Sequence, residues 1–241
     1  MPALSLTTVS SSESSNPRRE LLQRCAVFKG LSDGVLSELA LASQPTRLER
    51  KRARTGMLRG LFVVGAGRAR LVRTIGSRIV TLHYVGPGEV YGEGFLSDEN
   101  EDVELLVLGE LDALRVPLTA MRRLLDQEPS VALALLDVQN ARRRQVEDRL
   151  TAVLTRTVEA RVADFVAQAC ERHGIPDSRG ILIGEKFTHI EIAEYVGATR
   201  ETVTLVLGVL KRDGIIDTDH RRIVVRDAAG LQQRATATAA P

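Results

Sequence analysis

The sequence predicts an α+β fold in which a small antiparallel β domain is followed by one long helix and then by a second domain of short helices and strands. Three observations predict it. Residues 48–116 contain short β-rich runs that glycines interrupt at intervals of roughly 8 to 12 residues, as in a small sandwich or barrel. Residues 130–153 keep apolar residues at helical spacing, and residues 158–225 alternate short helical and β-rich segments.

Length and composition fit this organisation and exclude several functions. The 241 residues are 44% hydrophobic and 27% charged, which is enough apolar material for a core in each of two domains. Aromatic residues make up only 3% and there is no Trp, so stacking platforms for single-stranded nucleic acid or for sugars are not expected. Residues 1–16 lack the pattern of a signal peptide, and no apolar run reaches the roughly 18 residues of a membrane span. We therefore expect a cytoplasmic protein.

The net charge of +2 hides two opposed blocks. Residues 47–78 contain ten basic residues and one acid, Glu49, whereas residues 89–112 contain nine acids and no Lys or Arg. Adjacent blocks of opposite sign most simply indicate neighbouring strands and loops that neutralise each other. An interaction surface is the alternative.

Two short helices are expected to open the folded part. Residues 1–18 are interpreted as a disordered, Ser-rich tail. Helical apolar spacing then appears at 19–24 and 33–41, separated by a turn at Lys29-Gly30. The β-rich runs that follow are 61–64, 69–73, 79–85, 90–92, 105–108 and 111–116. An amphipathic helix over 118–126 precedes Pro129, which suits the first turn of the next helix.

The long helix over 130–153 carries an apolar stripe with a spacing of roughly 3.5 residues, interrupted by three consecutive arginines at 142–144. The stripe consists of Val131, Leu135, Val138, Val146, Leu150 and Val153. Because a lone helix would leave this stripe in water, it packs either along its own domain or against a second copy of the chain. The length of the stripe favours a homodimer.

Two short helices near the C-terminus form a helix-turn-helix pattern. After a helix over 158–172 capped by Thr157, Thr188 and Glu191 make a capping box for a helix over 189–195. Gly197 and Thr199 then separate it from a second helix over 200–212. The residues expected to face inward in that second helix are Val203, Val206, Leu207 and Leu210. Residues 217–220 are expected to form a turn between Ile216 and a strand over 221–225, which completes a winged arrangement with a strand over 181–183.

The outward face of the second helix suits DNA reading. Arg200, Glu201 and Thr204 occupy its first turns, where a helix in the major groove presents side chains to base edges. Arg can bind guanine O6 and N7 with two hydrogen bonds, and Glu can accept from the cytosine N4 amine. Residues 153–241 carry equal numbers of acids and bases, so affinity must come from local placement. The candidate phosphate contacts are the helix starts at Thr188 and Thr199, with Arg200, Lys211, Arg221 and Arg222.

The segment EIAEYVGATRETVTLVLGVLKRDGII resembles the helix-turn-helix signature of the Crp/Fnr family of transcription regulators. GPGEVYGE resembles the end of that family's nucleotide-binding β-roll, and LLDQEPSVALALL the entry to its dimer helix. The resemblance covers about residues 20–230. It implies a cyclic-nucleotide-binding-like jelly roll over 19–126, a dimerisation helix over 127–155 with a hinge near Arg156-Thr157, a winged helix-turn-helix over 156–230 and a tail over 231–241. It further implies a homodimer that reads a palindromic promoter site through Arg200 and Glu201, with RNA polymerase as a candidate partner.

The sequence departs from the cyclic-nucleotide-binding members in its β-roll. Those members follow a Gly-Glu with an Arg-Ser about ten residues later, the Arg pairing with the cyclic phosphate and the Glu with the ribose. Gly92 and Glu93 are present, but Asp102-Val103-Glu104 stands where the Arg is needed, and acids repel a phosphodiester. We therefore expect a regulator independent of cyclic AMP, with no cofactor.

Other sensors known in the family are also not expected. The iron-sulfur members use four cysteines, and this chain has only Cys25 and Cys170, which are expected to be reduced thiols. Haem would need His83 or Cys25, and His83 lies in a strand where a packed or edge residue is expected. No metal site and no enzyme motif is present in the sequence.

Two questions stay open at this stage. Leu205 stands where many relatives have another Arg, and it either contacts a thymine methyl or packs inward. The alternative function is an effector-gated regulator of the same family whose β-roll, with Gly92 and Glu93 as candidate effector residues, binds a small molecule or a cation. Residues 98–102 lack the glycine and terminal Glu of a calcium loop, which argues against calcium.

Overall fold

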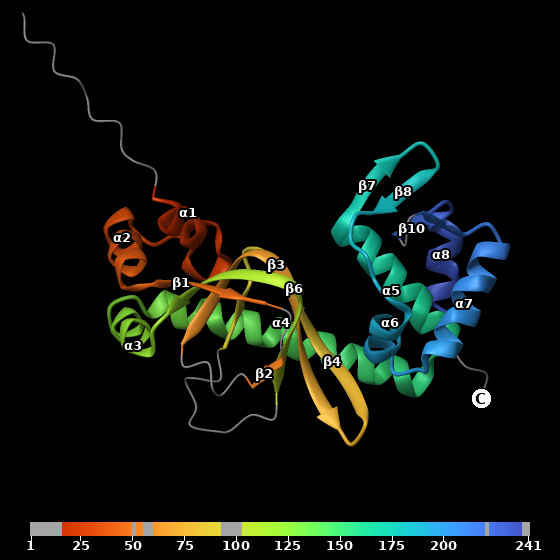
Figure 1. The fold of residues 1–241 in the computed structure, drawn as a ribbon, viewed down its shortest axis with the longest axis horizontal. Coiled ribbons are helices and arrows are strands. Elements are labelled where there is room, and N and C mark those ends of the chain that lie inside the picture. Colours follow the sequence, from red (N-terminus) through yellow and green to blue (C-terminus); the bar gives the residue numbers. More distant parts are fainter. Residues whose placement is uncertain (1–15, 50–51, 55–59, 93–102, 220–221, 238–241) are drawn as a thin grey trace, which may run out of the picture.

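A computed structural model describes residues 16–49, 52–54, 60–92, 103–219 and 222–237. It has a β-rich N-terminal half and a mainly helical C-terminal half, joined by the long helix α4 (Pro129–Thr155) that runs beneath both (Figure 1). The predicted α+β fold is confirmed.

The N-terminal domain is built on a sheet in which every strand pairs antiparallel to its neighbour, in the order β1-β6-β3-β4, with β2 on β6 and β5 on β3. Its strands are β1 (Gln44–Leu48), β2 (Arg52–Arg54), β3 (Leu61–Ile75), β4 (Arg78–Val85), β5 (Val90–Tyr91) and β6 (Glu104–Val116). The helices around it are α1 (Pro17–Arg24), the 3-10 turn η1 (Ala26–Phe28), α2 (Asp33–Ala42) and α3 (Leu118–Gln127). One core lies between these helices, α4 and the sheet, and a second lies within the sheet domain around Phe62, Tyr91 and Leu105.

Strand β3 is one continuous element, so the prediction of two strands on either side of Gly65 and Gly67 was wrong. The register with β6 shifts between Val64 and Ala66 and again between Gly67 and Ala69, which marks two irregularities of the β-bulge kind. Gly67 has a φ of +85°, and a Cβ there would lie 2.0 Å from the Glu110 carbonyl oxygen. The glycines therefore bend the strand without ending it, which is a common use of glycine in sheets.

The opposed charge blocks neutralise each other only in part. On the paired strands β1 and β6, Arg47 lies opposite Asp112 and forms ion pairs with Asp112 and Glu110. Arg68 and Arg70 instead contact the C-terminal domain. Part of the basic block therefore balances the acids of β6, and part of it contacts the C-terminal domain of the same chain.

The first helix begins earlier than predicted. Asn16 caps α1 by accepting from the Arg18 backbone N–H at 3.1 Å, and Pro17 occupies the first turn. Since proline has no N–H to lose and its φ suits a helix start, Pro17 opens the helix. The assignment of Pro17 and Arg18 to the tail was therefore wrong.

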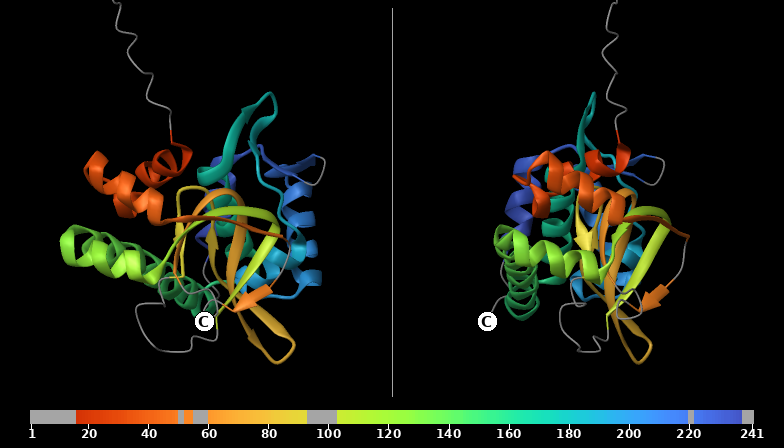
Figure 2. Two further views of the ribbon diagram at one scale, coloured as in Figure 1. Left: turned by 60° about the vertical axis from the view of Figure 1, so that its left-hand side comes forward. Right: turned by 90° about the vertical axis from the view of Figure 1, so that its left-hand side faces the viewer.

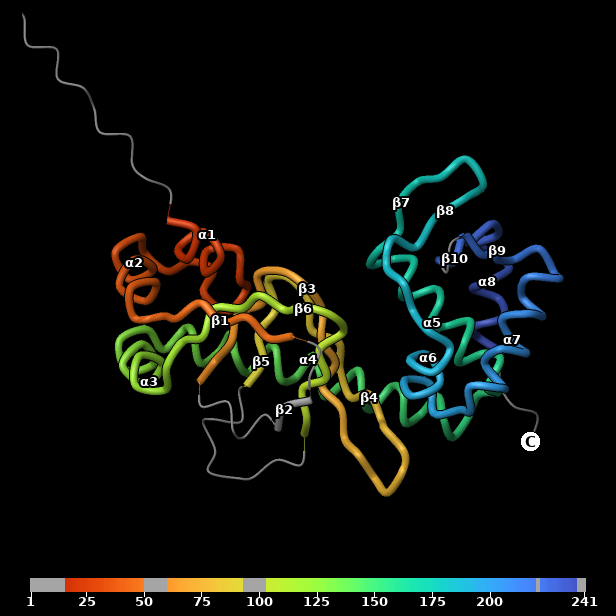
Figure 3. Tube along the Cα trace, viewed as in Figure 1, coloured from red at the N-terminus to blue at the C-terminus, as the bar shows by residue number. Residues whose placement is uncertain are grey.

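Helix α4 uses one end of its apolar stripe for its own domain. Val131 and Leu135 are buried in the core of their own N-terminal domain, which leaves them no surface for a dimer contact. Val138 is half-buried against the same core, and its place in a dimer face stays a prediction. The other predicted members, Val146, Leu150 and Val153, are exposed, and α4 carries further exposed apolar residues at Leu133, Leu136 and Leu154. In Figure 3 the first part of α4 lies beside the N-terminal helices, and the helix continues beyond them toward the C-terminal domain.

Within its described residues, the C-terminal domain has four helices and a four-stranded antiparallel sheet in the order β7-β8-β10-β9. The helices are α5 (Val158–His173), α6 (His189–Val196), α7 (Arg200–Arg212) and α8 (Ala228–Ala235). The strands are β7 (Gly174–Asp177), β8 (Gly180–Ile183), β9 (Ile216–Asp219) and β10 (Arg222–Val225). The predicted pairing that makes the wing is confirmed, because Val224 and Val225 of β10 pair with Leu182 and Ile181 of β8.

Three elements of this domain differ from the prediction. Strand β7 contains Pro176, which suggested a loop, but β7 is an edge strand, where proline is tolerated. Strand β9 occupies residues predicted as a turn. Helix α8 covers part of the predicted tail, and its Leu231 and Ala235 are buried against the domain core. Asp227 caps this helix by accepting from the Gly230 N–H at 2.9 Å.

Candidate nucleic-acid interface

Helix α6 begins with the predicted capping box. The Thr188 hydroxyl accepts from the Glu191 backbone N–H at 3.2 Å, and the Glu191 carboxylate accepts from the Thr188 backbone N–H at 2.7 Å. Two of the amide donors that a helix start leaves unpaired are thereby satisfied. The Thr188 hydroxyl is used by this cap, so a DNA phosphate at this end would meet backbone N–H groups.

The turn between α6 and α7 depends on Gly197. It has a left-handed φ of +70°, and the N–H groups of Gly197 and Ala198 both bind the Ala193 carbonyl oxygen at 3.0 Å. Arg161 of α5 donates to the Val196 carbonyl oxygen at 2.6 Å. These bonds satisfy carbonyl groups at the end of α6 and set the direction in which α7 leaves.

Helix α7 begins and ends where the sequence predicted, with Thr199 as its N-cap. All four residues expected to face inward are buried: Val203, Val206, Leu207 and Leu210. The opposite side presents Arg200, Glu201, Thr204 and Leu205, all exposed, which we call the reading face. Leu205 is 71% exposed, so it does not pack inward.

The polar side chains of the reading face differ in whether they already form hydrogen bonds within the chain. Within the described part of the chain, the side chains of Arg200 and Glu201 make no hydrogen bond or ion pair. Thr204 is engaged twice: its hydroxyl donates to the Arg200 carbonyl oxygen at 2.9 Å and lies 2.7 Å from His189 Nδ1. His189, at the start of α6, was missed because its contact with Thr204 lies 15 residues away and leaves no local pattern.

The basic residues near the wing are mostly paired with acids. Lys211 contacts Asp217 and Thr218 at 3.0 Å each, and Arg226 also binds Asp217. These donors hold the pKa of the Asp217 carboxyl down at about 2, with the Lys211 hydrogen bond as the largest cause. Arg222 is half-buried, and Arg221 lies outside the described residues. Lys211 therefore reaches a phosphate only by sharing or leaving Asp217.

Comparison of the sequence with known proteins identifies the family to which the chain belongs. A model of the Crp-like helix-turn-helix domain matches residues 160–234. The chain is 33% identical over 183 residues to the cyclic AMP receptor protein of Thermus thermophilus, covering 72% of this chain and 78% of that protein. The chain belongs to the Crp/Fnr family of DNA-binding transcription regulators, whose members are not enzymes.

Two further relatives span nearly the whole chain. The CRP-like cAMP-activated global transcriptional regulator of Mycobacterium tuberculosis is 26% identical over 223 residues, covering 90% of this chain and 99% of that protein. The structure of a CooA mutant from Carboxydothermus hydrogenoformans has the same fold, with a TM-score of 0.71 at 21% identity, covering 90% of this chain and 95% of that one.

In the described part of the chain, no helix is both long and apolar enough to cross a membrane.

The candidate effector residues of this Crp/Fnr chain are described only in part. Gly92 has a φ of +89°, and a Cβ there would lie 2.6 Å from the Gly60 carbonyl oxygen, so it has a structural reason to be glycine. Glu93 and residues 98–102 lie outside the described residues. Glu104, which stands in the acidic segment, accepts from the Thr74 hydroxyl at 3.0 Å.

His83 and the two cysteines have the environments of packed residues. Burial, together with the charges of Arg142 and Arg149, lowers the pKa of His83 to about 3, so its imidazole is neutral. Cys25 is buried and Cys170 partly so, and burial raises the pKa of both thiols. A raised pKa disfavours the reactive thiolate, as in thiols packed among apolar groups.

In this Crp/Fnr chain, side chains of β3 and α4 contact helix α6 of the helix-turn-helix, next to strand β4. Arg70 of β3 forms an ion pair with Glu194 of α6. Arg149 of α4 donates to the Thr81 carbonyl oxygen of β4 at 2.6 Å. The Arg149 guanidinium also lies 4.4 Å from the centre of the Tyr195 ring of α6. In both views of Figure 2, the helices of the C-terminal domain lie next to the β-rich domain. The orientation of the reading face is thus tied to the N-terminal domain.

Proposed function

We propose that this chain is a homodimeric regulator that reads a palindromic promoter site through Arg200 and Glu201 and acts without a cyclic nucleotide. One observation carries the DNA-reading part: two exposed side chains of opposite charge, without partners among the described residues, stand in the first turns of a helix whose other side is fully anchored. An exposed Arg and Glu next to each other would ordinarily be a solvated surface feature. On the second helix of a helix-turn-helix, they occupy the positions that face base edges.

The chemistry of the reading face favours a G·C step. The Arg200 guanidinium can donate two parallel hydrogen bonds to guanine O6 and N7, and the Glu201 carboxylate can accept from the cytosine N4 amine. Leu205 is exposed on the same side, which favours contact with a thymine methyl. The Thr204 hydroxyl is already bonded, so its methyl group is the part left for DNA.

Phosphate contacts come from the helix starts and a few cations. The backbone N–H groups behind Thr188 and Thr199 are candidate anion-binding sites, and Lys211, Arg221 and Arg222 are the further candidate phosphate contacts. Because most wing cations are paired with acids, each subunit contributes modest affinity. Two half-sites bound by a dimer compensate for that weakness.

The exposed apolar face of α4 supports the homodimer. It extends from the first turns to the last turn of the helix and consists of Leu133, Leu136, Val146, Leu150, Val153 and Leu154. Exposed apolar residues in such a row mark an interaction surface, and a two-fold contact between two copies of α4 would cover it.

Independence from cyclic AMP rests on the residues that replace the phosphate-binding Arg. Two relatives are named for cyclic AMP, but this chain has Asp102-Val103-Glu104 at the matching place. A phosphodiester there would meet carboxylates instead of a guanidinium. RNA polymerase is a candidate partner by the same family relationship.

The deciding experiment compares the wild type with Arg200→Ala on a palindrome selected from a random library, by fluorescence anisotropy with and without cyclic AMP. Arg200→Ala should weaken specific binding by roughly 1 to 3 kcal/mol and relax the preference at one base pair of each half-site. The matched control is Arg212→Ala, which removes an exposed cation from the far end of the same helix and should affect all sequences about equally.

Two results would contradict the proposal. If Arg200→Ala keeps the full ratio of specific to non-specific affinity, Arg200 does not read bases. If micromolar cyclic AMP is needed for specific binding, the chain is an effector-gated regulator, which is the second candidate function.

A further inference from the structure

A cavity of about 290 Å³ lies where the N-terminal domain meets the C-terminal domain. Arg68 and Tyr84 contribute from β3 and β4, and Phe165, Phe187 and Tyr195 contribute from α5, the segment before α6, and α6. Its volume is at the lower end of the range for small-molecule sites. Gly92, the described candidate effector residue of the β-roll, is not among the residues that line it.

The walls are unusually aromatic for this chain. The sequence has three Tyr, five Phe and no Trp, and four of these eight rings form one cluster beside the cavity. Phe165 packs at right angles to Phe187 with 5.1 Å between ring centres, and Tyr84 lies 5.9 Å from Phe187 and 5.7 Å from Tyr195. Rings in such edge-to-face arrangements offer faces and edges to a further flat ring.

Two polar atoms of the wall are buried and have no hydrogen-bond partner among the described residues. The Tyr84 hydroxyl has no hydrogen-bond partner among the described residues, and burial raises the pKa of Tyr84, so the hydroxyl stays a donor. The Arg68 guanidinium lies 4.5 Å from the centre of the Phe187 ring and donates to the Lys186 carbonyl oxygen at 2.9 Å. Its Nη1 atom is buried, makes no hydrogen bond, and lies 3.6 Å from the Glu185 carboxylate. Buried unpaired donors are costly, so an acceptor that enters the cavity is favoured.

The charge of the wall favours a single negative charge on that acceptor. Among the described residues, Arg68 and Arg172 are the cations of the lining and Glu89 is its acid, while Glu185, outside the lining, lies 3.6 Å from Arg68 and leaves Arg172 as the cation without an ion pair. His173 also lines the cavity, and burial lowers its pKa, which favours the neutral imidazole. A carboxylate can accept from both a guanidinium and a phenol, and charge-assisted bonds of this kind are the strong ones.

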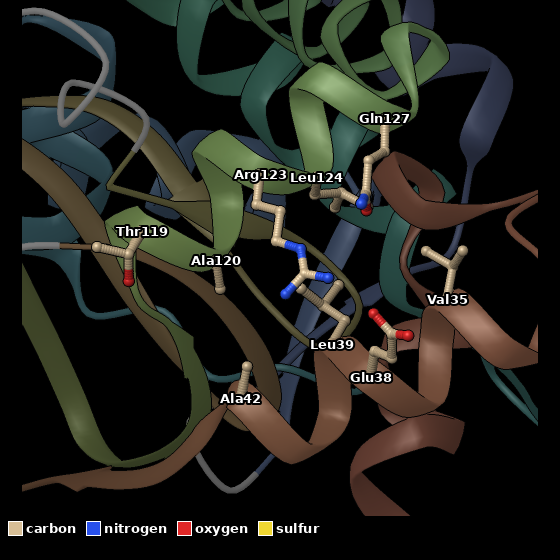
Figure 4. Close-up of a pocket in the computed structure, with 9 residues that line it drawn as sticks. All are labelled: Val35, Glu38, Leu39, Ala42, Thr119, Ala120, Arg123, Leu124 and Gln127. Carbon is tan, nitrogen blue, oxygen red and sulfur yellow. The ribbon is translucent and has the colours of Figure 1, made fainter.

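A second cavity of about the same volume shows the contrast. It lies between α2 and α3, with Leu39, Ala120 and Leu124 as apolar walls and Glu38 and Arg123 facing the same space (Figure 4). It has no aromatic wall, and none of its lining residues has a buried side-chain atom that lacks a partner. This second cavity therefore shows neither of the two features that indicate a ligand at the interdomain cavity.

We propose that the interdomain cavity binds a small aromatic monocarboxylate, with its ring among Tyr84, Phe165, Phe187 and Tyr195 and its carboxylate on the Arg68 guanidinium and the Tyr84 hydroxyl. Because both domains line the cavity, the bound molecule stabilises this arrangement of the helix-turn-helix. That regulatory consequence rests on the proposed DNA-binding function, whereas the binding itself does not.

Calorimetry on the full chain with benzoate, 4-hydroxybenzoate and phenylacetate tests the site. Benzamide, which has the ring without the charge, and acetate, which has the charge without the ring, are the control ligands. At least one aromatic acid should bind in the micromolar to millimolar range, and both control ligands should bind at least about tenfold more weakly.

Four variants locate the site. Tyr84→Phe keeps the ring and should weaken binding about tenfold, which corresponds to one lost hydrogen bond to a charged group. Its melting temperature should stay the same or rise, because an unpaired buried hydroxyl is removed, whereas a merely structural hydroxyl would lower it. Arg68→Met should abolish binding, and Arg123→Met at the α2–α3 cavity is its matched control. Gly86→Phe places bulk at the rim, where a Cβ meets nothing within 4 Å.

The proposal is overturned if no aromatic acid binds the wild type, or if Tyr84→Phe and Gly86→Phe both bind as the wild type does. Coupling is measured separately, as the change in DNA affinity at saturating ligand. By linkage, DNA must change the ligand affinity by the same factor. If the ligand binds and DNA affinity does not change, the regulatory consequence is wrong. If the chain binds no specific DNA at all, the proposed function is wrong, and calorimetry still shows whether the cavity binds an aromatic acid.

Discussion

Arg70 of β3 and Glu194 of α6 form an ion pair across the two domains, with 2.5 Å between Nη1 and Oε2. The side chains are only 5% and 14% exposed, and the same Nη1 atom lies 3.0 Å from the Thr81 hydroxyl. A buried pair gains little over two apolar residues, but loss of one partner leaves a buried charge uncompensated. This pair therefore makes the position of the helix-turn-helix depend on the N-terminal domain.

Removing the negative charge of this pair should be costly. Glu194→Gln leaves Arg70 buried without its counter-ion and should lower the free energy of unfolding by about 3 kcal/mol. The double variant Arg70→Met with Glu194→Leu should recover most of that loss. Urea unfolding of the single and double variants measures both.

The exposed pair Arg143–Glu147 on α4 is the matched control, because both side chains are more than half exposed. Glu147→Gln should change stability by less than about 0.5 kcal/mol. Equal losses in Glu194→Gln and Glu147→Gln would show that burial of the interdomain pair has no energetic effect.

The turn of the helix-turn-helix should not tolerate a side chain at Gly197. Its φ of +70° is unfavourable for other residues, and a Cβ would lie 3.4 Å from Arg161 Nη1. Gly197→Ala should lower stability by about 1 to 2 kcal/mol. Gly208→Ala in α7 is the control: nothing lies within 4 Å and its φ is not positive, so it should raise stability by roughly 0.5 to 1 kcal/mol. Thermal unfolding followed by circular dichroism distinguishes the two, and equal effects would refute the conformational explanation.

The exposed face of α4 predicts the oligomeric state. Leu150→Glu places a charge in the middle of that face and should shift the chain from dimer to monomer without loss of helix content. Leu41→Glu changes a still more exposed leucine, in α2, and should leave the dimer intact. Sedimentation velocity reports both, and a wild type that sediments as a monomer would remove the proposed dimer.

His83 should make stability fall in mild acid. Its pKa is about 3 in the folded chain and about 6.5 when exposed, so the unfolded chain binds the extra proton as the pH falls below 6.5. The stability contributed by the neutral ring is complete above pH 6.5 and is lost toward pH 3, at roughly 1 kcal/mol per pH unit. The difference between wild-type and His83→Asn unfolding free energies, measured from pH 7.5 to 5, should shrink as the pH falls. A constant difference would contradict the burial of this ring.

The helix-turn-helix was predictable because its determinants are local. The capping box of Thr188 and Glu191, the N-cap Thr199 and the buried positions of α7 depend on spacings of three or four residues. The β-bulges at Gly65 and Gly67 were less predictable, because glycine both ends strands and bends them. Only the pairing of β3 with β6 distinguishes the two.

By itself, the sequence determined the fold class, the order of the main helices, the family and the candidate reading residues Arg200 and Glu201, since each follows from a short-range pattern. Only the tertiary structure decided which end of the α4 stripe is exposed, that Arg68 and Arg70 face the C-terminal domain, and that four of eight aromatic rings gather beside one cavity. The physical reason is distance along the chain. Arg70 and Glu194 are 124 residues apart, and such contacts form only when the packing of whole elements brings their side chains together.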